Sequence, residues 1–164
     1  MAFSKQDEIF MREALRQAEQ AYSCGETPVG AVLVWDGEIV ASAYNRRETD
    51  KNAMSHAECM VISEACGKLG GWRLHKATLY VTLEPCPMCA GAIINSRIAR
   101  VVYGAKDPKA GCCGSIVDLF SLPFNHRPVV ESGLLEEECR DLLTGFFREM
   151  RTKQKTFKTA NPSK

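Results

Sequence analysis

The pattern of hydrophobic and polar positions along the chain predicts alternating helices and strands. Segments with apolar residues at helical spacing, or with helix start signals, are predicted to be helices, and they cover residues 4–24, 56–69, 88–96 and 134–153. Short runs rich in β-branched and aromatic residues are predicted to be strands, and they cover residues 29–35, 39–44, 77–83, 100–104 and 129–130. The polar segment 45–55 is predicted to be a loop, and 115–120 a helical turn.

Glycine and proline mark the boundaries of these elements. Asp36-Gly37, between two predicted strands, is a strong signal for a two-residue hairpin turn. Gly25 and Gly70 stand where helix C-caps are expected, and Pro87 stands in the first turn of a predicted helix. The order of elements predicts an α/β fold in which one mixed five-stranded sheet lies between helices on both faces, a three-layer α/β/α sandwich.

The length of the chain fits one compact domain. Its 164 residues are 45% hydrophobic, which is enough for a single core. The net charge is +1, but residues 148–164 hold six Lys and Arg against one Glu, so the rest of the chain is mildly acidic. We expect a domain over residues 1–152 and a basic tail over residues 153–164. Such a tail favours contact with a polyanion, and a merely solvated C-terminus would have the same composition.

The eight cysteines could indicate either a disulfide framework or a set of reduced thiols. The first residues are polar and charged, without an apolar signal segment, and no stretch of the sequence reaches the length of a membrane span. We therefore expect a cytoplasmic protein without a membrane partner, in which thiols stay reduced. The cysteines are then core residues or metal ligands.

Two short motifs carry the candidate chemistry. The first is His-x-Glu at residues 56–58, and the second is Cys-x-x-Cys at residues 86–89. Each motif alone is weak, because His-x-Glu arises often by chance and Cys-x-x-Cys also occurs in redox pairs, structural zinc sites and ordinary cores. The two motifs together, each at the start of a predicted helix, are far more specific.

One histidine and two cysteines make three zinc ligands, His56, Cys86 and Cys89, and leave a fourth position for water. Thiolates in the first turn of a helix are favoured by the positive end of the helix dipole. A closed structural site would need a fourth protein ligand, for which Cys59 and the pair at 112–113 are the spare candidates. We expect the open site, with one zinc ion per subunit, and the closed site is the alternative.

Glu58 follows the predicted histidine ligand by two residues. A carboxylate beside zinc-bound water can take its proton and return it to a leaving group. The same glutamate could instead stabilise an exposed first helical turn through the helix dipole. The neighbouring zinc motif favours the catalytic interpretation.

The layout of these motifs resembles the cytidine-deaminase-like superfamily. Seven segments resemble one family within it, the bacterial tRNA-specific adenosine deaminases, and they are residues 28–34, 44–46, 55–58, 77–92, 96–98, 101–107 and 125–127. The resemblance runs from about residue 7 to residue 152. Met54, Cys112 and Cys113 are less usual choices for that family, but they do not touch the predicted ligands.

The resemblance implies an activity and a mechanism. The activity is conversion of adenosine to inosine at the wobble position, the first of the anticodon, by a homodimer that binds the anticodon arm of a tRNA. The mechanism is attack of zinc-bound hydroxide on C6 of a flipped adenine. Glu58 is then expected to protonate N1 of the ring and to assist the departure of ammonia.

The resemblance also implies a set of substrate contacts. These are Val29, Asn45, Ala57, Asp107, Lys109, Asn125, Phe146, Arg148 and Arg151. Several have plainer roles, since Asn45 and Asp107 also suit turns and Val29 suits the core of a strand. Phe146 and Phe147, which match the same RNA-lining helix, are adjacent, so only one of them can face the core.

Two other functions remain open on the sequence alone. A deaminase of the same fold acting on free bases or nucleotides, such as guanine or cytosine, would share the zinc site, although the basic tail favours a polyanionic substrate. A non-catalytic zinc-binding module would instead have a closed coordination sphere.

Overall fold

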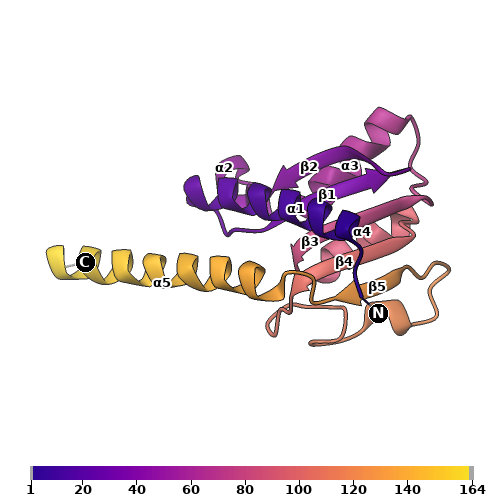
Figure 1. Cartoon of the computed structure of the whole chain (residues 1–164). Helices are drawn as coiled ribbons and strands as arrows, with labels where there is room; N and C mark the ends of the chain where they lie inside the picture. The colour runs from indigo at the N-terminus through magenta and orange to yellow at the C-terminus, as the bar shows by residue number, and fades with distance from the viewer. Residues whose placement is uncertain (1, 163–164) are drawn as a thin grey trace.

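The structure, a computed structural model, describes residues 2–162 of the chain. A mixed five-stranded sheet lies at its centre, in the order β2-β1-β3-β4-β5 (Figure 1). The strands are β1 (Gly30–Trp35), β2 (Glu38–Tyr44), β3 (Ala77–Leu83), β4 (Arg100–Ala105) and β5 (Val129–Ser132). β1 is antiparallel to both of its neighbours, whereas β3, β4 and β5 run parallel.

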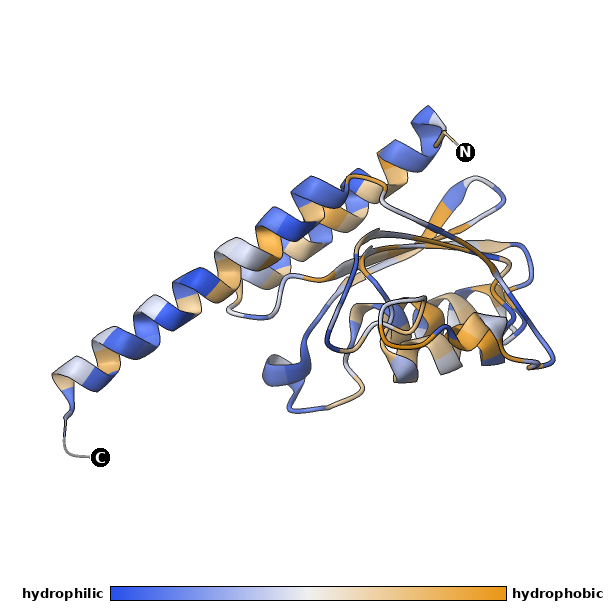
Figure 2. Cartoon of the chain, turned by 90° about the horizontal axis from the view of Figure 1, so that it is seen from below, coloured by the Kyte–Doolittle hydropathy of each residue, from blue (hydrophilic) through white to orange (hydrophobic). Residues whose placement is uncertain are grey.

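Helices cover both faces of this sheet (Figures 1 and 2). They are α1 (Lys5–Ser23), α2 (Arg47–Asp50), α3 (Ala57–Leu69), α4 (Pro87–Ser96) and α5 (Glu136–Ala160), with a 3-10 turn η1 (Leu119–Ser121). Leu33 belongs to a core cluster with residues of α3 and α4, and its neighbour Val32 belongs to a second cluster with residues of α1 and α5. Consecutive strand residues point to opposite faces, so both sides of the sheet are buried. The predicted three-layer α/β/α class is confirmed.

Two segments differ from the sequence prediction. The segment 45–55, predicted to be a loop, contains the short helix α2, whose first amides at Glu48 and Thr49 donate to the buried carboxylate of Glu26. The last helix, predicted to end near Lys153, continues to Ala160. Among the helices of residues 2–162, none combines the length and the apolar character needed to cross a bilayer.

The N-termini of α3 and α4 meet at the edge of the sheet where β3 ends. His56 is the N-cap residue of α3, and Cys86 is the N-cap residue of α4. Pro87 opens α4, where its fixed φ suits a helix and its missing amide removes no hydrogen bond. The positive ends of two helix dipoles therefore point toward the same place.

Candidate metal centre and substrate pocket

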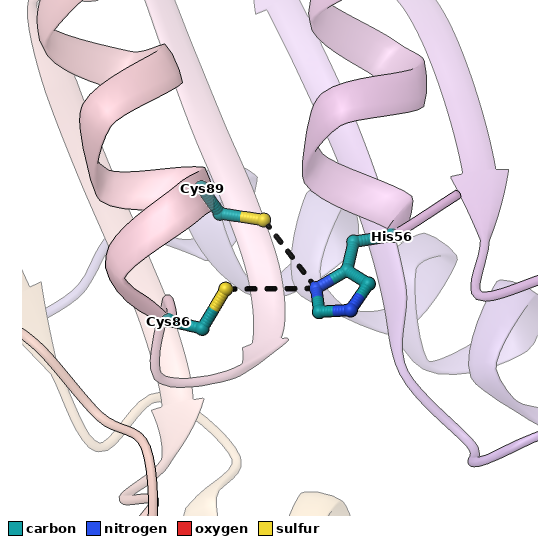
Figure 3. A group of neighbouring side chains, drawn as sticks. All are labelled: His56, Cys86 and Cys89. Atoms are coloured by element: carbon teal, nitrogen blue, oxygen red, sulfur yellow. Dashed lines mark hydrogen bonds between the residues drawn. The ribbon is translucent and has the colours of Figure 1, made fainter. Parts of the chain in front are cut away.

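The starts of α3 and α4 bring the three predicted zinc ligands together (Figure 3). Nδ1 of His56 lies 3.6 Å from Sγ of Cys86 and 3.6 Å from Sγ of Cys89. The three donor atoms all lie within 4.8 Å of one another. Cys89 is fully buried, whereas His56 and Cys86 are half-buried and border a pocket.

These separations fit a tetrahedral zinc ion. Zinc binds imidazole nitrogen at about 2.0–2.1 Å and thiolate sulfur at about 2.3 Å, so nitrogen and sulfur at tetrahedral positions lie about 3.6 Å apart. Both nitrogen–sulfur distances have this value. One imidazole and two thiolates are also a donor set that suits zinc. Hydrogen bonds with Cys89 and with His56 lower the pKa of Cys86 to about 4 in spite of its burial, so the thiolate that a metal needs is available.

A further sulfur lies beside the cluster. Sγ of Cys59, one of the spare candidates for a fourth ligand, is 3.7 Å from Sγ of Cys89. Within residues 2–162, however, the group whose donor atoms all lie within 4.8 Å contains His56, Cys86 and Cys89 and no other side chain. Cys112 belongs to the buried core cluster, and Cys113 is partly buried against the same cluster. The geometry thus favours three protein ligands over four.

Glu58 lies in the first turn of α3 and lines the pocket, with only 4% of its surface exposed. Burial raises the pKa of Glu58 to about 7, and the negative charge of Cys86 acts in the same direction. A carboxyl group with this pKa can both take up and release a proton near neutral pH. The plainer interpretation, an exposed first-turn glutamate, does not fit this burial.

A cavity of about 630 Å³ opens in front of the donor atoms. Cavities of this size hold small organic ligands. Eight of the site residues predicted from the sequence line it, and they are Val29, Asn45, His56, Ala57, Glu58, Cys86, Asp107 and Lys109. The chain therefore brings together residues from five separate stretches of sequence.

Asn45 combines a structural role with a place in the pocket wall. Its amide nitrogen donates to the carbonyl of Thr27 at 3.3 Å, and its Oδ1 accepts from the amide of Arg47 at 3.4 Å. Both hydrogen bonds are long for this kind of contact, so they orient the Asn45 side chain but hold it only weakly. Thr27 and Arg47 line the same cavity.

A buried glutamate, Glu84, shapes another part of the pocket wall. The Glu84 carboxylate accepts hydrogen bonds from the amides of Asp107 (2.9 Å), Cys113 (2.9 Å) and Ser115 (3.1 Å), and from the Ser115 hydroxyl. Burial alone would raise the pKa of Glu84, but the Ser115 hydroxyl and these amides lower it on balance. An ionised Glu84 thus holds the segment after β4 against the pocket. No motif in the sequence assigns a role to Glu84.

Four predicted RNA contacts lie outside the pocket lining, and they are Asn125, Phe146, Arg148 and Arg151. Phe146 is only 6% exposed and packs edge-on against Tyr22, with 5.4 Å between the ring centroids. Its neighbour Phe147 is 45% exposed and lines the pocket. The expectation that only one of these two rings faces the core is confirmed. Asn125 and the two arginines are exposed, and their RNA contacts stay predictions.

Several lining residues were missed from the sequence, among them Thr27, Arg47, Lys106, Arg140, Leu143 and Thr144. Arg140 and Thr144 precede Phe147 by seven and three residues, a spacing that puts all three on one helix face, so their signal was present. No spacing in the sequence indicated Arg47. This residue lies on the short helix α2, which is stabilised by Glu26, a residue distant in the sequence.

Comparison with known proteins decides the family. The MafB19-like deaminase family matches residues 5–151. The tRNA-specific adenosine deaminase of Bacillus subtilis is 57% identical over 151 residues, which cover 92% of this chain and 94% of that relative. This chain belongs to the tRNA-specific adenosine deaminase family. The resemblance stated from the sequence motifs is thereby confirmed.

Solved structures agree with membership of the tRNA-specific adenosine deaminase family. A structure from a study of A-to-I editing by tRNA:A34 deaminases at the wobble position aligns with a TM-score of 0.80 and 49% identity, over 82% of this chain and 99% of that one. A guanine deaminase from Nitrosomonas europaea aligns with a TM-score of 0.68 and 23% identity, over 85% and 83%. The second likeness shows only that the cytidine-deaminase-like fold is shared with a free-base enzyme.

Proposed function

We propose that this protein converts adenosine to inosine at the first anticodon position of a tRNA. One observation carries the proposal: His56, Cys86 and Cys89 converge beside buried Glu58, at the floor of a cavity large enough for a nucleoside. Membership of the tRNA-specific adenosine deaminase family supports the substrate. Each turnover consumes one water and releases one ammonia.

His56, Cys86 and Cys89 would hold one zinc ion, because their donor atoms have the spacing and the softness that zinc requires. When bound, zinc lowers the pKa of a water in an open fourth position to about 7 and so supplies a nucleophile at neutral pH. The cavity gives that fourth position access to a substrate.

Glu58 moves the protons of the reaction. Its carboxylate takes the proton that the nucleophile gives up, protonates N1 of the adenine, and later delivers a proton to the departing ammonia. Its pKa of about 7 is suited to both directions of transfer. Its burial keeps bulk water from competing for these protons.

The chain's remaining site residues orient the substrate. Asn45 and the backbone amide of Ala57 would hydrogen-bond the flipped nucleotide, and the Val29 side chain would pack against the face of its base. Asp107 and Lys109, in the cavity wall, would contact the RNA next to the flipped nucleotide, and Asn125, Arg148 and Arg151 would contact it outside the cavity. Phe146, which is only 6% exposed, would support these contacts from the core instead of touching the RNA. We infer a homodimer in the cytoplasm that binds the anticodon arm across both subunits, on the strength of the family resemblance.

The deciding experiment offers several substrates to zinc-loaded protein in one mixture. They are an anticodon stem-loop with adenosine at the first anticodon position, a matched stem-loop with that adenosine moved one position along the loop, and free adenosine, guanine and cytosine. We expect inosine only in the first stem-loop. Conversion of a free base with the RNA untouched would make the protein a free-base deaminase instead. Zinc binding with no conversion of any substrate would leave a non-catalytic zinc-binding module.

A further inference from the structure

Cys59 lies beside the metal centre without belonging to it. Its sulfur is 3.7 Å from the sulfur of Cys89, so the two atoms are in contact. Within residues 2–162, the donor atoms that all lie within 4.8 Å of one another are those of His56, Cys86 and Cys89. A free thiol that is not needed as a ligand therefore touches one of the three groups that would bind zinc.

Two packed helices hold this pair of sulfurs together. Cys59 is the third residue of α3, and Cys89 is the third residue of α4. The two helices begin side by side at the metal centre and contact each other (Figure 3). A disulfide needs a sulfur–sulfur distance of about 2.0 Å. Rotation of the two side chains and a small adjustment of the helices would bring the sulfurs to that distance.

The two sulfurs differ in their access to solvent. Cys89 is fully buried, whereas Cys59 is partly exposed. Oxidants act first on accessible sulfur, and hydrogen peroxide is small enough to reach a partly exposed side chain. In a compartment that keeps thiols reduced, the disulfides that do form are transient and report on oxidants. The pair thus has the properties of a reversible oxidation site.

We propose that peroxides oxidise Cys59, which then forms a disulfide with Cys89 and so dismantles the metal centre. Peroxide converts the Cys59 thiol to a sulfenic acid and is reduced to water. The Cys89 thiolate attacks that sulfur, the sulfur–oxygen bond breaks, and hydroxide leaves. The two sulfurs together give up two electrons, and the peroxide takes them up.

The disulfide would remove one of the three ligands. Metals bind the thiolate form of cysteine, and Cys89 in a disulfide is no longer a thiolate. His56 and Cys86 alone fall short of the three or four protein ligands of zinc sites, so we expect the ion to leave. A dithiol reductant would restore both thiols, whereas oxidation to a sulfinic acid would be irreversible. The inference rests on the zinc site of the proposed function.

Two other interpretations fit the geometry less well. A disulfide between Cys86 and Cys89 would join two ligands, whose sulfurs are both engaged when the metal is bound, but the Cys59 thiol lies outside that set. A permanent fourth ligand would have its sulfur within the cluster of donors, and the sulfur of Cys59 does not belong to it. Contact with a single ligand sulfur is what disulfide formation requires.

The test treats full-length, zinc-loaded protein with hydrogen peroxide after the reductant has been removed. Wild type, Cys59→Ala and Cys66→Ala are compared. Cys66 is the matched control, because it lies about two turns further along the same face of α3 and is also partly buried, but takes no part in the contact with Cys89. A chromogenic chelator follows zinc release, and mass spectrometry of an unreduced digest identifies cross-linked peptides.

We expect wild type and Cys66→Ala to release their zinc and to give a peptide pair joined through Cys59 and Cys89. A dithiol reductant with added zinc should restore metal content and RNA conversion. Cys59→Ala should retain its zinc under the same treatment, because no partner for Cys89 remains outside the ligand set.

Three results would overturn the oxidation site while RNA conversion by untreated protein left the proposed function standing. They are zinc retained by wild type, zinc lost from Cys59→Ala at the wild-type rate, and a cross-link between Cys86 and Cys89 in place of the expected one. The peptide analysis uses wild-type protein, so it decides the point even if Cys59→Ala did not fold. Protein that bound no zinc before the treatment would overturn the metal site and the oxidation site together.

Discussion

Asp7 and Arg100 are joined by a charged hydrogen bond of 2.6 Å, although 93 positions separate them in the chain. Asp7 lies in the first turn of α1 and Arg100 begins β4, so the bond ties an outer helix to the sheet. The Tyr80 hydroxyl donates to the same carboxylate at 2.7 Å. Burial alone would raise the pKa of Asp7. The hydrogen bonds from Arg100 and Tyr80 outweigh this effect and hold the pKa well below its usual range.

Asp7→Asn is expected to lower the free energy of unfolding at pH 7 by about 1–3 kcal/mol, since it removes a charged acceptor that is only 7% exposed. Because the native pKa lies below the unfolded value of about 3.9, the unfolded chain takes up this proton first as the pH falls. The contribution of Asp7 is therefore complete above about pH 5 and is lost progressively below it. Urea unfolding should show that the difference in free energy of unfolding between variant and wild type is smaller at pH 3 than at pH 7.

Glu8→Gln is the control for that measurement. Glu8 pairs with Arg12 on the same helix, but both side chains are about half exposed. Such surface pairs contribute ~0–1 kcal/mol. If both variants lost stability equally and with the same pH dependence, the buried position of Asp7 would not be the cause.

Glu58→Gln is expected to retain zinc and fold but to lose about 10²–10⁴-fold in turnover, because an amide cannot relay protons. Glu64→Gln on the same helix is the matched control, since Glu64 is an exposed residue paired with Lys68. Single-turnover conversion of the stem-loop under saturating enzyme separates this loss from weaker binding. A Glu58→Gln protein with wild-type turnover would remove Glu58 from the mechanism.

Cys86→Ala is expected to lose the zinc ion, whereas Cys59→Ala is expected to keep it. Cys86 is one of the three clustered donors, whereas Cys59 lies outside that group, with its sulfur 3.7 Å from the sulfur of Cys89. Metal analysis after dialysis measures both variants side by side. Loss of zinc from Cys59→Ala would point to a fourth protein ligand and to a closed structural site.

Local spacing in the sequence was enough to select the three side chains that cluster at the candidate metal centre. His56 heads one helix, and the two cysteines, three residues apart, head another, so helix geometry alone aims each group outward from a helix N-terminus. The layers of the fold could also be predicted from local sequence, because the spacing of apolar residues distinguishes strands from helices. That the two helix starts meet was implied by the family resemblance, because local spacing does not bring together residues 30 positions apart.

The features that were missed depend on distant contacts or on polar sequence. α2 forms because the Glu26 carboxylate accepts hydrogen bonds from the first amides of this helix. No local sequence pattern predicts a partner that lies 22 residues away. The outer turns of α5 carry no apolar repeat, so periodicity ends near Lys153 while the helix continues by propagation to Ala160. Glu84 directly precedes the Pro-Cys-x-x-Cys motif, whose pattern indicates metal ligands and gives no sign of a buried carboxylate.

The contact between Gly111 and Glu84 gives a test of the pocket wall. A Cβ on Gly111 would overlap the Glu84 carboxylate, which holds the amides of Asp107 and Cys113. Gly111→Ala is therefore expected to displace this segment, to lower stability by about 1–3 kcal/mol, and to raise the KM for the stem-loop more than it lowers kcat.

Gly67→Ala is the matched control for that substitution. Gly67 lies inside α3, and a Cβ there would meet no heavy atom within 4 Å. Alanine should raise stability by about 0.4–1 kcal/mol, because it stiffens the unfolded chain and favours the helix. Urea unfolding and steady-state kinetics of both variants decide the point. If Gly111→Ala behaved like Gly67→Ala in both measurements, the hydrogen bonds of Glu84 would not be what shapes the pocket wall.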